Sequence, residues 1–168
     1  MSSLEKQSQV HYRHLGREMA LQFIFQHEVV ECGYDDEVMA RFWEQLKSSL
    51  EDCDERLFRR GRRYAESIIA GVKKNQTVID EQISKFSKRW DLDRMAVVDC
   101  NIVRIAVYEM FFVPEIPPIV SIDEAVTLAL DFSDERAMTF INGILNAIKN
   151  TLKRPAREKV ESIPKQDK

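Results

Sequence analysis

The stretch AVVDCNIVRIAVYEMFFV, from Ala96 to Val113, is apolar on nearly every side over the length of a helix, and a proline-rich break follows it. Beyond that break come SIDEAVTLALDF (Ser121 to Phe132) and TFINGILNAI (Thr139 to Ile148). Apolar residues in both recur at the three- and four-residue spacing of an amphipathic helix. Because a helix that is apolar all round is enclosed by other helices, these blocks predict a helical bundle around a buried central helix.

The rest of the chain is also predicted to be helical. Only five glycines and five prolines interrupt it, and no segment is convincing as a strand, so we predict an all-α fold with long helices. Asp35 or Asp36 should cap the second helix, a capping box from Ser121 to Glu124 should open the sixth, and Ser133 or Asp134 should cap the last. The predicted set is about seven helices, near 10–30, 36–50, 54–72, 76–86, 92–113, 121–132 and 135–152.

Composition narrows the class of protein. With 168 residues and 44% hydrophobic content, the chain is long enough for one domain with a substantial core. Its net charge of -3 argues against indiscriminate coating of nucleic acid, so any RNA site must be a local patch. Cys32, Cys53 and Cys100 form no C-x-x-C pair, which suits reduced thiols. Since the sequence offers no signal peptide or membrane span, we expect a cytoplasmic protein.

Motifs for catalysis and metal binding are not found. The sequence has no Gly-rich phosphate loop, no H-E-x-x-H and no nucleophile elbow, so we expect no enzymatic activity. His11 and His14 are three residues apart, but no third ligand lies near them in sequence. We therefore expect neither a metal site nor a cofactor.

Basic residues near the N-terminus form the first candidate binding surface. Arg13 and Arg17 are four residues apart on the first predicted helix, with His14 beside them and Lys6 on the preceding segment. Guanidinium groups at that spacing can contact successive phosphates whatever the base sequence. An ordinary solvated helix face has the same pattern, and these residues alone leave both interpretations open.

Five short motifs follow one another in order along the chain. They are Arg17-Glu-Met-Ala-Leu-Gln22, Ile68-Ile-Ala-Gly-Val72 followed by Asn75, Arg104-Ile-Ala-Val-Tyr-Glu109, Ile122-Asp-Glu-Ala-Val126 and Phe140-Ile-Asn-Gly143. Their order and spacing resemble those of the bacterial NusB family of transcription antitermination factors. The resemblance extends from about Arg17 to Leu152, although no motif matches between about Cys32 and Arg59.

This resemblance implies both a fold and a function. It implies two packed helical bundles, at about 10–73 and 75–152, in one compact domain spanning 1–154, while the polar residues 155–168 should form a disordered tail. The implied function is binding of the boxA element of ribosomal RNA operon transcripts together with NusE, a small-subunit ribosomal protein. Such binding would support processive elongation by RNA polymerase with other Nus factors.

The resemblance also implies site residues. Its RNA-contacting surface matches the basic N-terminal region, which favours phosphate contacts by Lys6, Arg13, His14 and Arg17. Phe25 and Phe140 are aromatic candidates, because an exposed Phe can stack on an unpaired base; core packing is the alternative. Asp99 matches an acidic position that faces NusE, and no basic residue lies three or four positions from it to form an intrahelical ion pair.

Two further charged features have no motif in the family. Arg56, Arg59, Arg60 and Arg63 form a stripe at helical spacing, with Arg62 adjoining. We favour pairing of this stripe with the acids just upstream, Glu51, Asp52, Asp54 and Glu55, and keep an auxiliary RNA surface as the alternative. Arg104 is a charge in an otherwise apolar helix and needs an acidic partner, for which Glu124 is a candidate.

Two other functions stay open. Because the N-terminal arginines are sparse for the family, the chain could be a helical protein-interaction adaptor with weak RNA binding. It could also be a stand-alone relative of the NusB-like domain of RNA cytosine methyltransferases, although the α/β domain such an enzyme needs for its methyl donor would not fit in this length. Family members occur as monomers and as homodimers, and the sequence does not choose between them.

Overall fold

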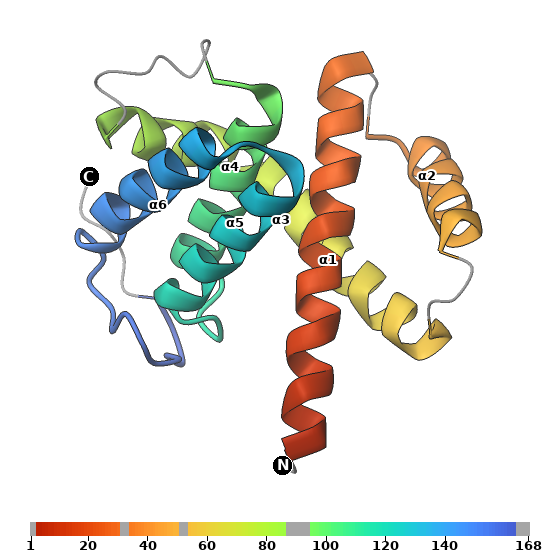
Figure 1. Cartoon of the computed structure of the whole chain (residues 1–168), viewed down its shortest axis with the longest axis horizontal. Helices are drawn as coiled ribbons and strands as arrows, with labels where there is room; N and C mark the ends of the chain where they lie inside the picture. Colours follow the sequence, from red (N-terminus) through yellow and green to blue (C-terminus); the bar gives the residue numbers. More distant parts are fainter. Residues whose placement is uncertain (1–2, 31–33, 51–53, 87–94, 164–168) are drawn as a thin grey trace. The chain divides into compact units, whose positions relative to one another are not determined.

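Six helices form the described part of the chain, with no strand among the described residues, which confirms the all-α prediction (Figure 1). The computed structural model describes residues 3–30, 34–50, 54–86 and 95–163; within these ranges the side chains of residues 3–11 and 30 are not described. The helices are α1 (Ser3–Val30), α2 (Asp36–Ser49), α3 (Glu55–Phe86), α4 (Val97–Phe112), α5 (Pro118–Phe132) and α6 (Glu135–Lys149). Two compact units divide the chain, residues 1–69 and 70–168.

One helix replaces two that the sequence predicted. The predicted helices near 54–72 and 76–86 are a single helix, α3, so the predicted number of seven helices is wrong. Nothing between Lys73 and Gln76 stops a helix, since this segment has neither proline nor glycine. The Asn75 side chain instead donates to the Gly71 carbonyl one turn earlier, at 2.8 Å.

The predicted helix caps have mixed outcomes. Asp35 caps α2 by accepting from the Val38 amide at 2.8 Å, and Asp134 caps α6 through Ala137 at 2.7 Å, both as predicted. The capping box at Ser121 is wrong, because α5 begins three residues earlier at Pro118, whose fixed φ suits the first helical position. Ser121 is therefore inside the helix and buried, and its hydroxyl donates to the Glu109 carboxylate at 2.8 Å.

Aromatic rings and a close helix crossing hold the N-terminal unit together. Phe23 of α1 meets Phe42 of α2 edge-on at 5.1 Å between ring centroids, and His27 stacks on Phe23 at 3.9 Å. Where α1 passes α3, a Cβ atom on Gly16 would lie 2.8 Å from the Gly61 carbonyl oxygen. The two helices can approach this closely only because Gly16 has no side chain.

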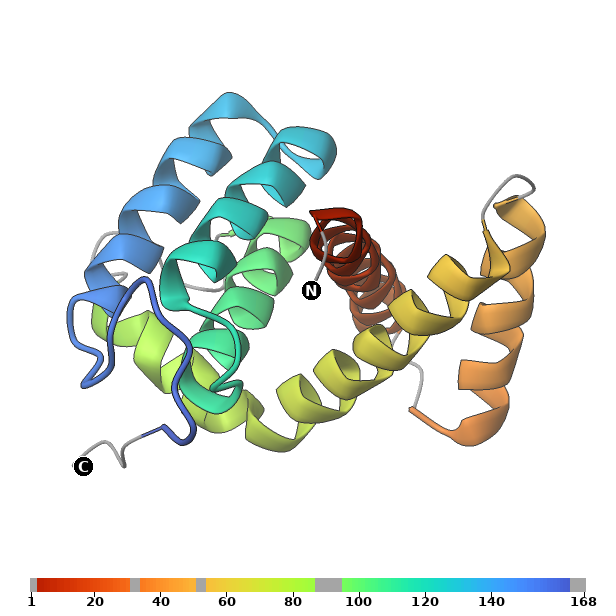
Figure 2. The same cartoon turned by 90° about the horizontal axis from the view of Figure 1, so that it is seen from below.

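In the C-terminal unit, α4, α5 and α6 pack against one another around an almost entirely buried α4 (Figure 2). The buried Arg104 of α4 pairs with Asp80 of α3, an acid that the sequence analysis did not single out. Its Nε and Nη2 donate to the two carboxylate oxygens at 2.8 and 3.1 Å, and its Nη1 donates to Asn101 at 3.0 Å. No helix over the described residues combines the length and apolar content that a membrane crossing requires.

Two residues of the sequence motifs, Gly71 and Tyr108, meet inside this unit. A Cβ atom on Gly71 would collide with the Tyr108 ring, so the glycine is needed for α3 and α4 to pack. Burial of Tyr108 raises the pKa of its phenol, and the neighbouring Glu109 and Glu115 raise it further. These two motif residues thus have a packing role.

The chain beyond α6 returns to the α4–α5 connection. Backbone amides of Ile119 and Val160 donate to the carbonyls of Ala156 and Pro114, at 3.0 and 3.1 Å. The buried Arg154 donates to the carbonyls of Met110, Val113 and Ile116. Part of the segment predicted as a tail, up to Val160, therefore has defined contacts.

Candidate nucleic-acid interface

Arginines and tyrosines from α1 and α3 come together on the N-terminal unit. Cζ of Arg60 lies 4.1 Å from the centroid of the Tyr12 ring, and Cζ of Arg13 lies 5.8 Å from the rings of both Tyr12 and Tyr64. The two rings meet edge-on at 6.2 Å. We call Tyr12, Arg13, Arg60 and Tyr64 the basic aromatic face. Cation–π contact orients the guanidinium groups without neutralising their charge.

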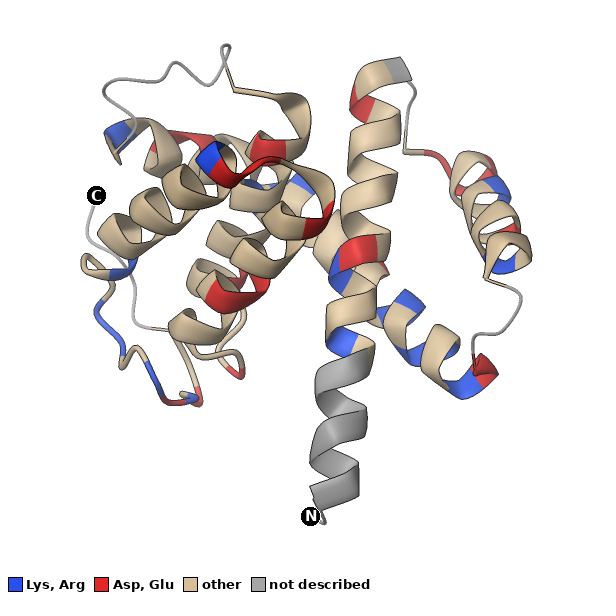
Figure 3. Cartoon of the chain, in the orientation of Figure 1, with Lys and Arg blue, Asp and Glu red and all other residues tan. Residues whose placement is uncertain are grey.

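Arg13 keeps its charge available on this face. Its side chain is half-buried, and no carboxylate among the described residues forms an ion pair with it. Its Nε is buried without a hydrogen-bond acceptor in the described part of the chain. Figure 3 shows blue segments of α1 and of the first turns of α3, which mark Lys and Arg in this unit. A guanidinium in this state suits an anionic ligand.

The other predicted members of the N-terminal cluster are placed differently. Arg17 is buried, with 2% of its surface exposed, so the prediction of an exposed Arg13–Arg17 pair is wrong for Arg17. Its Cζ lies 5.5 Å from the centroid of the Tyr64 ring, so the buried Arg17 packs against Tyr64. His14 is half-buried and lies 3.3 Å from the Glu18 carboxylate. Lys6 lies in α1, but its side chain is outside the described residues, as is that of His11.

The aromatic candidates come from different units. Phe25 of α1 is 40% exposed, which meets the first requirement for stacking on a base. Phe140 of α6 is half-buried and makes contacts of its own. Three residues on, Gly143 is exposed, and a Cβ atom there would meet nothing within 4 Å. The fold therefore does not require this glycine, unlike Gly16 and Gly71.

Asp99 has a structural partner. It is half-buried near the start of α4, and its carboxylate accepts from the Ser133 hydroxyl at 2.5 Å. This bond ties α4 to the connection between α5 and α6. Any contact of Asp99 with a partner protein would share the carboxylate with Ser133.

Of the acids expected to pair with the arginine stripe, the two that the structure describes have other partners. Glu55 pairs with Lys47 at 3.3 Å, and Asp54 accepts from the Arg56 backbone amide at 2.9 Å. Arg62 pairs with Glu66, one turn further on rather than upstream, at 2.8 Å. Glu51 and Asp52 lie outside the described residues. Glu55 therefore does not pair with the arginine stripe, while pairing of the stripe with the other upstream acids stays a prediction.

Sequence reasoning missed Tyr12, Tyr64 and Arg60 as members of the face. The tyrosines are separated by 52 positions, and only the crossing at Gly16 and Gly61 brings them together. The glycine pair itself could have indicated the crossing. A glycine inside a helix weakens that helix, and its presence is explained when another backbone approaches closely.

Fold and face together define an all-helical protein whose N-terminal unit carries a cluster of arginines and tyrosines. A sequence profile described as the NusB family matches residues 14–150. The transcription antitermination protein NusB of Sorangium cellulosum (strain So ce56) is 38% identical over 149 residues, which cover 88% of this chain and 98% of that protein. The protein of the same name from Bacillus thuringiensis (strain Al Hakam) is 37% identical over 140 residues, covering 83% and 98%.

Solved structures agree. T. maritima NusB superposes with a TM-score of 0.62 at 35% identity, covering 81% of this chain and 89% of that one. A structure of antitermination factors NusB and NusE in complex with double-stranded RNA gives a TM-score of 0.67 at 23% identity, covering 82% and 95%, and this likeness concerns the fold alone. The chain belongs to the NusB family.

Proposed function

We propose that this protein is a transcription antitermination factor that acts in the cytoplasm and has no catalytic role. It binds the boxA element of ribosomal RNA operon transcripts together with NusE and supports processive elongation by RNA polymerase with other Nus factors. The observation that carries this proposal is the family match over residues 14–150, with relatives named as transcription antitermination proteins.

The basic aromatic face supports an RNA role. Arg13 and Arg60 supply guanidinium groups for phosphates, and the charge of Arg13 has no carboxylate partner among the described residues. Tyr12 and Tyr64 orient them, while the buried Arg17 supports Tyr64. Lys6 and His14 add positive or donor groups along α1, and Phe25 and Phe140 offer rings for base stacking. Phosphate contacts of this kind position RNA, and bases are read elsewhere.

An RNA-binding experiment tests the proposal. Wild-type protein should bind a short boxA RNA more tightly than a scrambled RNA, and NusE should strengthen that binding, as measured by fluorescence anisotropy. Arg13→Ala should weaken binding and reduce the slope of log K against log salt by about 0.7, the value for one phosphate contact on a single strand. Arg41→Ala is the matched control, since it removes an exposed arginine that pairs with Glu37 in the same unit.

Each result has a distinct meaning. Equal affinity for boxA and scrambled RNA, with or without NusE, would contradict the proposed function. An unchanged salt slope in Arg13→Ala would remove Arg13 from the site while leaving the function standing. A protein that binds NusE but binds no RNA would favour the protein-interaction adaptor, the alternative suggested by the sparse N-terminal arginines.

Asp99 is proposed to contact NusE through charge complementarity with that partner. Its bond to Ser133 means that Asp99→Lys also disturbs the C-terminal unit. Ser133→Ala removes the same internal bond while keeping the carboxylate, and so serves as the control. A pulldown of NusE should weaken for Asp99→Lys and not for Ser133→Ala; equal loss in both variants would assign Asp99 a purely structural role.

A further inference from the structure

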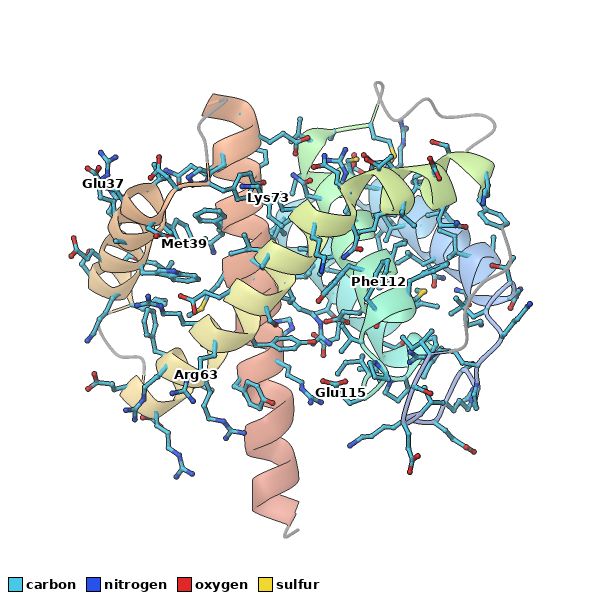
Figure 4. All side chains as sticks on the ribbon, turned by 180° about the vertical axis from the view of Figure 1, so that it is seen from behind. Glu37, Met39, Arg63, Lys73, Phe112 and Glu115 are labelled. Carbon is cyan, nitrogen blue, oxygen red and sulfur yellow. The ribbon has the colours of Figure 1, made fainter. Side chains whose placement is uncertain are left out.

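The first half of α3 carries a row of exposed arginines outside the basic aromatic face. Arg56, Arg59 and Arg63 are all exposed and lie on one side of the helix, because their spacings of three and four residues match its period. We call these three the α3 arginine row. Arg63 is labelled on this part of the helix in Figure 4.

The charge of this row is not neutralised by any residue that the structure describes. In the part of the chain that the structure describes, none of the three guanidinium groups forms an ion pair. The acids at the start of α3 are occupied, Glu55 by Lys47 and Asp54 by a backbone amide. Arg63 is eight residues beyond Glu55, or about 12 Å along the helix, so Glu55 is remote from it.

The row is continuous with the basic aromatic face. Arg60 lies between Arg59 and Arg63 in sequence and reaches the Tyr12 ring of α1, at 4.1 Å. Arg13 contacts the same ring. One positive surface therefore runs from α1 across Arg60 onto α3, all within the N-terminal unit.

The chemistry of this surface favours a nucleic-acid strand over a protein. Between Glu55 and Ile69, no large apolar side chain is exposed, whereas protein interfaces have an apolar centre. Arginine forks bind phosphate through paired hydrogen bonds, and a polynucleotide presents phosphates in series.

We propose that the α3 arginine row binds the backbone of single-stranded RNA that continues out of the boxA site. The row thereby lengthens the RNA footprint beyond the element that is recognised. This inference rests on the proposed function, since it requires boxA binding at the adjoining face. It assigns the row a share of the affinity for long transcripts and none of the selectivity for boxA, because phosphate contacts do not read bases.

Matched charge-removing variants test the proposal. Arg59→Gln/Arg63→Gln is compared with Lys74→Gln/Lys85→Gln, which removes two exposed charges from the second half of the same helix. Binding is measured by anisotropy to a minimal boxA RNA and to boxA extended with uridines on either side. Circular dichroism and melting curves check that both variants fold, which exposed and unpaired side chains should allow.

We expect the arginine double variant to bind at least one extended RNA about tenfold more weakly at low salt, with the salt slope reduced by about 1.4 for two lost contacts. Affinity for minimal boxA should change by less than about twofold. The lysine control should change little for either RNA. Arg59→Lys/Arg63→Lys should keep part of the lost affinity, since it retains the charge but not the fork.

Other outcomes overturn the inference. An unchanged affinity for extended RNA, or an equal loss for minimal and extended RNA, would show that the row does not contact flanking RNA. If poly-glutamate displaces the extended RNA from the protein as effectively as poly-uridine does, the row is a site for an acidic protein. Failure of the wild-type protein to bind minimal boxA would refute the proposed function, and the inference with it.

Discussion

Arginines are used differently in the C-terminal unit and at the basic aromatic face of the N-terminal unit. In the C-terminal unit, Arg104 donates to the carboxylate of Asp80, and Arg154 donates to three backbone carbonyls. In the N-terminal unit, Arg13 and Arg60 lie against tyrosine rings, which orient a guanidinium but accept few of its hydrogen bonds.

The difference shows how surroundings decide the role of one residue type. The terminal nitrogens of Arg104 and Arg154 donate to protein acceptors, so these two arginines stabilise the fold. Arg13 lies against two tyrosine rings and forms no ion pair among the described residues, so it keeps its charge for an external anion. Mutations in the two units should therefore separate loss of stability from loss of binding.

The largest effect should come from Arg104→Met. Removing the guanidinium leaves the Asp80 carboxylate without its ion-pair partner and takes one hydrogen bond from the buried Asn101. This should cost about 2–3 kcal/mol in the free energy of unfolding, less than for a fully buried pair because Asp80 is partly exposed. Urea denaturation measures this. The double variant Arg104→Met/Asp80→Leu should recover part of the loss, and failure to do so would mean that the pair itself is not the source of the cost.

Gly16→Ala should act next most strongly, on the N-terminal unit. The new Cβ would lie 2.8 Å from the Gly61 carbonyl and 2.9 Å from Cδ1 of Tyr64, so α1 and α3 must separate, at about 1–3 kcal/mol. The separation also moves Tyr64 away from Arg13. Unfolding and boxA affinity should therefore both be impaired, and a variant with normal stability and normal RNA binding would contradict the crossing described here.

Gly143→Ala should have the opposite sign. A Cβ at this exposed position meets nothing, and alanine is the better helix former, so the variant should be more stable by about 0.5–1 kcal/mol. If the open surface around Gly143 receives a partner closely, the more stable variant should bind RNA or NusE more weakly. Thermal melting and the two binding assays, run together, decide this.

The sequence predicted the helical class and most helix positions, because apolar spacing and single-residue caps such as Asp35 and Asp134 are local signals. It failed where tertiary contacts decide. Ser121 looked like a cap but donates to Glu109 on another helix, and Arg104 found its acid 24 positions away at Asp80.

The candidate site was predicted in part. Arg13 was found from its charge, but its tyrosine neighbours were not, because Tyr64 reaches α1 only through the helix crossing. Arg17 has the same local signal as Arg13, yet it is buried. Helical spacing groups residues on one side of a helix, but it does not say whether another element covers that side.

The smallest effect should come from Glu66→Gln. Its pair with Arg62 is half-exposed and one turn apart in α3, so the change should cost only about 0.3–0.5 kcal/mol, and RNA affinity should stay the same or rise slightly as a negative charge is lost. Chemical denaturation with anisotropy measures both. If Glu66→Gln lost more stability than Gly16→Ala, the exposed ion pair would matter more than the packed helix crossing, which would contradict this ranking.

Arg154 also bears on how the protein resists digestion from its C-terminal end. The last carbonyls of α4 and of the turn after it have no helical partner of their own, and the Arg154 guanidinium supplies it. Burial lowers the pKa of Arg154, while Glu115 acts in the opposite direction and helps to hold the charge. Proteolysis of the described segment after α6 should therefore slow at the buried Arg154, with the helical bundle intact. Removal of Arg154 would take this donor from the carbonyls of Met110 and Ile116, and the trimmed chain should then be degraded as a whole.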